Sequence, residues 1–66
     1  MKNESEKSDR QVWSLPIELP TNLVRDKDDW YIEIFYGGFR LTVDKETAVD
    51  IVIHLKHYYE RISRDE

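Results

Sequence analysis

The chain has 66 residues and no cysteine, and its 14 acidic and 10 basic side chains give a net charge of -4. Such a length supports one small domain and leaves little chain to wall a deep catalytic cleft. The lack of cysteine excludes disulfides and thiolate metal sites, and no segment has the run of about 18 apolar residues that a membrane-spanning helix needs. We therefore expect a cytoplasmic protein that is not an enzyme and holds no cofactor.

The charges of both signs are mixed along the chain. A nucleic-acid-binding protein usually carries a basic stripe that neutralises phosphates, and the sequence has none. Residues 1–10 are polar after Met1 and are expected to form a disordered tail in front of a single domain over residues 11–66.

Residues 12–20 alternate between apolar and other side chains, which predicts an extended segment with one buried face. Pro16 and Pro20 lack backbone donors, so this segment is an edge strand or an arm that lies across a neighbour. The apolar side of the arm carries Trp13, Leu15, Ile17 and Leu19. Residues 21–29 hold a short apolar step at Leu23 and Val24, followed by a polar turn.

Residues 30–43 contain two β-rich runs around Gly37-Gly38, the composition of a two-residue hairpin loop. With these glycines as the loop, Tyr36 pairs with Phe39, Ile34 with Leu41, and Ile32 with Val43. These six side chains share one apolar face. The opposite, outer face carries Tyr31, Glu33, Phe35, Arg40 and Thr42.

Residues 44–63 have the pattern of one amphipathic helix, for which Asp44 is a suitable N-cap. Its apolar stripe is expected to cover the hairpin and to contribute to the core; it consists of Ala48, Ile51, Val52, Leu55, Tyr58, Tyr59 and Ile62. The fold class is therefore α+β, with an N-terminal extended arm or edge strand, an antiparallel hairpin over about 30–43 and a C-terminal helix over about 44–63 packed on the sheet.

The apolar side chains outnumber the core positions that such a fold provides. Leu15 and Ile17 on the arm, and Val49 and Ile53 on a shoulder of the helix, are therefore candidates for a dimer interface. We expect a homodimer, formed by strand addition at a hairpin edge, by exchange of the arm or by contact between helix shoulders. The alternative is a monomer with a few exposed apolar side chains.

Asp50, His54 and His57 lie on one helical face, and their side chains are of types that bind zinc. The chain lacks the H-E-x-x-H pattern, and Arg61 on the same face repels a cation. We interpret these residues as a solvated polar face and keep the metal site as a weak candidate.

The outer sheet face and the arm supply the candidate anchors for a partner: Trp13, Tyr31, Glu33, Phe35 and Arg40. Aromatic and arginine side chains of this kind dominate protein interfaces. The same face could instead stack nucleic-acid bases, although Glu33 and the charge balance argue against this. We expect a small acidic protein-binding module, an accessory regulator or inhibitor of the kind that phages and mobile elements often carry.

Overall fold

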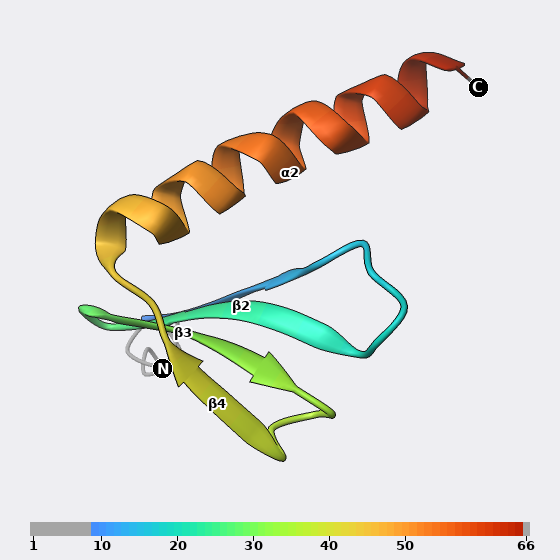
Figure 1. Ribbon diagram of the computed structural model, residues 1–66. Coiled ribbons are helices and arrows are strands. Elements are labelled where there is room, and N and C mark those ends of the chain that lie inside the picture. The colour runs from blue at the N-terminus through green and yellow to red at the C-terminus, as the bar shows by residue number, and fades with distance from the viewer. Residues whose placement is uncertain (1–8, 66) are drawn as a thin grey trace, which may run out of the picture.

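The computed structural model describes residues 9–65 and contains a four-stranded antiparallel sheet and one helix, an α+β architecture (Figure 1). The elements are β1 (Arg10–Ser14), β2 (Thr21–Asp26), β3 (Asp29–Ile34), β4 (Phe39–Thr42) and α2 (Lys45–Asp65). The strands follow one another across the sheet in chain order. Asp9 and Arg10, which the sequence assigned to the polar tail, already belong to the described chain, whereas residues 1–8 lie outside it.

β2 is an interior strand that the sequence did not reveal. Leu23 and Val24 point to opposite faces of the sheet, yet both are fully buried. A strand buried on both faces lacks the alternation that identifies a half-exposed strand. A tight turn joins it to β3, with Lys27 in the left-handed region at a φ of 60°.

The predicted arm is correct only as far as Ser14. β1 pairs with β2 along its whole length, but the chain then leaves the sheet. The Ile17 amide donates to the Leu15 carbonyl at 2.8 Å, which closes a three-residue turn around Pro16. Because of this turn, residues 15–20 form a loop and do not continue the strand.

The hairpin is confirmed, but the predicted register is wrong by two residues. Ile34 faces Phe39 and Glu33 faces Arg40, so residues 35–38 form a four-residue loop. Phe35 and Tyr36, as well as Gly37, have a positive φ. The observed register places Glu33 beside a cation, whereas the predicted one placed it beside Thr42. A shift of two residues preserves the sheet faces, and Ile32 and Leu41 therefore still share the apolar face.

The helix begins where the sequence predicted and packs on the apolar face of the sheet. The Asp44 carboxylate accepts from the Thr47 amide at 3.3 Å, which confirms this residue as the N-cap. Figure 1 shows α2 rising away from the sheet toward its C-terminus. Ala48 and Leu55 are buried, and the later apolar side chains of the expected stripe are exposed: Tyr58, Tyr59 and Ile62. No helix within residues 9–65 has the length and apolar character needed to span a membrane.

Candidate protein-binding surface

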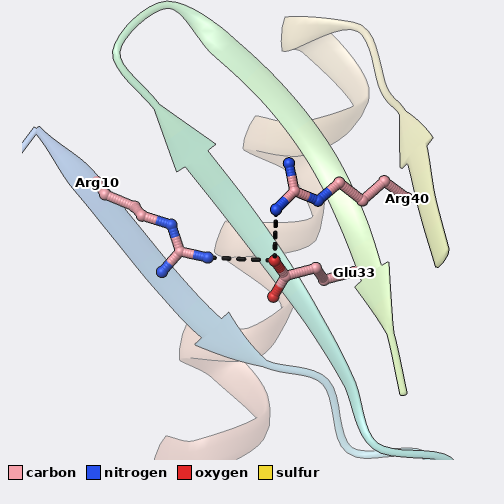
Figure 2. A network of polar contacts seen from close by, with 3 residues as sticks. All are labelled: Arg10, Glu33 and Arg40. Carbon is pink, nitrogen blue, oxygen red and sulfur yellow. Dashed lines mark hydrogen bonds and ion pairs between the residues drawn. The ribbon is translucent and has the colours of Figure 1, made fainter. Parts of the chain in front are cut away.

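The open face of the sheet holds a cluster of three charged side chains. Figure 2 shows Arg10 of β1 and Arg40 of β4 pointing toward Glu33 of β3, with the helix behind the sheet. The guanidiniums lie 3.2 and 3.6 Å from the Glu33 Oε2 atom. The Glu33 side chain is 9% exposed, against 44% for Arg10 and 61% for Arg40. The two arginines therefore neutralise a buried carboxylate and are themselves partly open to solvent.

Tyr31 lies beneath this cluster. The Arg40 guanidinium stands 4.8 Å from the centre of the Tyr31 ring, a cation–π contact, and the residue is buried. Hydrogen bonding to the Tyr31 side chain, reinforced by the nearby Glu33 carboxylate, raises the pKa of Arg10 above its usual value. The outer face is therefore occupied by its own ion pairs, and Tyr31 offers no free ring on which a base could stack.

The two other predicted anchors, Phe35 and Trp13, do not lie on this open face of the sheet. Phe35 is in the hairpin loop and not on β3, because the loop has four residues; its ring meets that of Phe39 edge to face at 6.0 Å. Trp13 stacks on Trp30 with ring centroids 5.8 Å apart. It lies on the helix-covered face and is half-buried. Of the predicted anchors, Phe35 and Arg40 are exposed.

A groove runs between the loop after β1 and the helix. The rising helix and the turn at Pro16 leave an open, mainly apolar space of about 510 Å³. Its apolar walls are Leu15, Pro16, Ile17, Ile51, Leu55 and Tyr58, and its polar lining is His54, His57 and Arg61. The sequence indicated Leu15 and Ile17 as interface residues. It did not indicate the helical wall, because Ile51, Leu55 and Tyr58 had been assigned to the core.

The polar lining holds two of the three residues of the weak metal candidate, His54 and His57, while Asp50 lies outside the groove. The Nδ1 atom of His54 lies 2.8 Å from the Asp50 carbonyl oxygen, and His57 faces Glu60 at 4.0 Å. Within the part of the chain that the structure describes, no group of three or more potential ligands is close enough to hold a metal ion. Because a carbonyl oxygen only accepts, the His54 Nδ1 atom is the donor in this contact, and in the neutral ring the other nitrogen is an acceptor.

The two remaining interface candidates, Val49 and Ile53, are exposed on α2 and do not line this groove. Other exposed apolar side chains are Phe39 and Leu41 on β4, at the opposite edge of the sheet, and Tyr36 in the hairpin loop. The sequence placed all three on the apolar face that the helix covers, so it gave no sign of their exposure.

Comparison with protein-family models, with curated proteins and with solved structures found no match to this chain.

Proposed function

We propose that this chain is a protein-binding module whose groove receives an apolar segment of another protein. The observation that carries the proposal is the groove between residues 15–17 and α2, where apolar side chains from two elements converge and leave an open space. Apolar grooves bounded by a helix are common docking sites for peptide segments. By occupying a segment of its partner, such a module acts as a regulator or inhibitor.

The scarcity of core residues supports this proposal. Among the described residues the buried apolar side chains are Leu23, Val24, Tyr31, Ala48 and Leu55. The exposed large apolar side chains are more numerous, and Ile17 and Tyr58 in the groove are among them. A small domain has little stability to spare, so exposing these side chains is best explained by their burial in a complex.

The polar lining of the groove favours an acidic partner segment. Arg61 lies along the same wall as the apolar side chains, and its guanidinium can pair with a carboxylate once the groove is filled. The expected partner segment therefore presents apolar side chains to the groove and carries aspartate or glutamate at its flank.

The test is affinity capture from host lysate with the full chain as bait, followed by mass spectrometry. The groove variant is Ile17→Glu, because Ile17 is 56% exposed and lines the groove. The matched control is Leu19→Glu, which lies in the same loop, is 48% exposed and does not line the groove. We expect one protein to be captured by the native chain and by Leu19→Glu, and to be lost with Ile17→Glu.

Circular dichroism must show that both variants keep the native fold. Equal capture by the two variants overturns the assignment of the groove. A nuclease-treated lysate separates the rival function: if the captured material disappears with nuclease, the chain binds nucleic acid and not protein.

A further inference from the structure

We infer that β4 is a self-complementary edge, through which two copies of this chain join into one continuous sheet. β4 has a neighbour only on its β3 side and lies at the far side of the sheet from β1 (Figure 1). Its apolar side chains are largely uncovered, with Phe39 61% and Leu41 57% exposed. An uncovered apolar edge strand is a ready template for strand addition.

The direction of the backbone groups on β4 follows from the ladder. The Val43 amide donates to the Trp30 carbonyl at 3.0 Å, so Val43 faces β3. Because bonded residues alternate along an antiparallel strand, Phe39 and Leu41 also face β3, and the amides and carbonyls of Arg40 and Thr42 point away from the sheet. A second strand has these groups available for pairing.

Symmetry restricts how two β4 strands pair. Outward-facing residues must meet outward-facing residues, so the two-fold axis passes through a residue and not between residues. An axis at Arg40 sets two arginines opposite each other, which is unfavourable. An axis at Thr42 extends the pairing to Asp44, which already caps the helix. An axis at Leu41 keeps the pairing centred within the strand.

The register centred on Leu41 satisfies both the backbone and the side chains. Arg40 of each copy pairs with Thr42 of the other, and both pairs exchange their backbone hydrogen bonds. Leu41 meets Leu41 and Phe39 meets Val43 on the face that carries the helices. Since the axis is normal to the sheet, both helices lie on this same face and flank the newly buried apolar side chains.

The other edge of the sheet is less suited to pairing. The Leu15 amide donates to the Thr21 carbonyl of β2, so the preceding residue, Ser14, turns its carbonyl away from the sheet. This carbonyl is already engaged, because the Tyr59 hydroxyl of α2 donates to it at 3.4 Å. On the helix-facing side β1 carries Gln11 and Trp13, and Trp13 is stacked on Trp30. No such contact from the helix engages β4 within the described residues.

The test combines solution mass with disulfide trapping on the full chain. In light scattering we expect a dimer mass at high concentration for the native chain. Leu41→Lys should raise the dissociation constant by at least roughly tenfold, because two lysines then face each other. The matched control Tyr36→Lys, at a more exposed position in the adjacent loop, should dimerise like the native chain.

The chain has no cysteine, so single-cysteine variants report the register directly. Leu41 lies at a non-hydrogen-bonded position, where opposing Cα atoms are about 4.5 Å apart, within the range for a disulfide. Leu41→Cys should therefore oxidise quickly to a covalent dimer, whereas Phe39→Cys and Tyr36→Cys should do so slowly.

A monomer mass at every concentration, or equal oxidation of the three cysteine variants, overturns the inference. A dimer that survives Leu41→Lys places the interface elsewhere and overturns it as well. Ile17→Glu should dimerise like the native chain. The experiment can therefore contradict the β4 dimer without contradicting partner binding in the groove, and the reverse.

Discussion

Glu33 shows how a single residue sets the arrangement of this sheet. Its carboxylate is almost removed from water and receives two guanidiniums from strands on either side of the β2–β3 pair. Burying an unpaired charge is costly, so a register that separates Glu33 from Arg40 is disfavoured. The ion pairs thus help to select the four-residue hairpin loop, even though Phe35 and Tyr36 then adopt a positive φ, which is unfavourable for aromatic residues.

We predict that Glu33→Ala lowers the free energy of unfolding by about 1–3 kcal/mol, because two arginines lose their buried partner. Glu33→Gln should fall between this variant and the native chain, since the amide oxygen still accepts hydrogen bonds. Urea unfolding measures the effect. Glu18→Ala is the control at an exposed position and should remain within about 0.5 kcal/mol of the native value.

At the scale of elements, α2 is firmly defined at its start and weakly held at its end. Asp44 caps the first turn, and Ala48 and Leu55 anchor the following turns on the sheet. Beyond Leu55 the apolar side chains of the helix are exposed, and the hydroxyl of Tyr59 makes a hydrogen bond to the backbone of β1. The second half of α2 rises away from the sheet, and the space between it and residues 15–17 is the groove.

The cap makes part of the stability dependent on pH. Hydrogen bonding to Thr47 holds the pKa of Asp44 below its usual range. A carboxyl whose pKa is lower in the folded state stabilises the fold above its unfolded pKa, and this contribution is lost as the pH falls through the folded pKa. We predict that Asp44→Ala melts below the native chain at about pH 7, and that this difference shrinks toward about pH 2.5. A constant difference in thermal melts across this range would contradict the prediction.

The two ends of α2 should respond differently to truncation of side chains. Leu55→Ala should cost about 2–4 kcal/mol, because Leu55 is buried against the sheet. Ile62→Ala should cost less than about 1 kcal/mol, because Ile62 is exposed. Chemical denaturation of the two variants at equal concentration compares them. Similar losses would mean that the end of the helix is packed.

At the scale of the whole molecule, the sheet is covered by one helix on one face, and two of the exposed apolar surfaces, the groove and the β4 edge, lie at separate places. The groove is formed by residues 15–17 and α2, whereas the other surface is the edge strand β4, so the two share no residue. The two proposals are therefore compatible: the groove is proposed to bind a partner and the β4 edge to join two copies. A dimer presents its groove twice, which strengthens binding to a partner that carries two target segments.

A dimer joined through β4 should be more stable at higher concentration. We predict that the melting temperature of the native chain rises by several degrees over about a hundredfold increase in protein concentration, because dissociation accompanies unfolding. Calorimetry at each concentration measures this rise. Leu41→Lys should melt at a temperature independent of concentration, and a native chain that behaves the same way would argue against the dimer.

The sequence by itself determined the hairpin strands, the helix, its cap and the side of the sheet that each hairpin strand residue faces. These features depend on local periodicity and on the geometry of single residues such as Asp44. The α+β class followed from them. The sequence also indicated that apolar side chains exceed the core, and it named Ile17, Val49 and Ile53 among the surplus, which are exposed; it did not indicate the exposure of Phe39 and Leu41.

Only the tertiary structure decided that Leu23 and Val24 lie in an interior strand, that Glu33 faces Arg40, and that the loop at Pro16 meets the helix across a groove. Each of these features depends on which strand, side chain or helix lies next to the residue in space. Alternation along a chain records which side a residue faces, and it is unchanged when a neighbouring strand slides by two residues or when a helix tilts away.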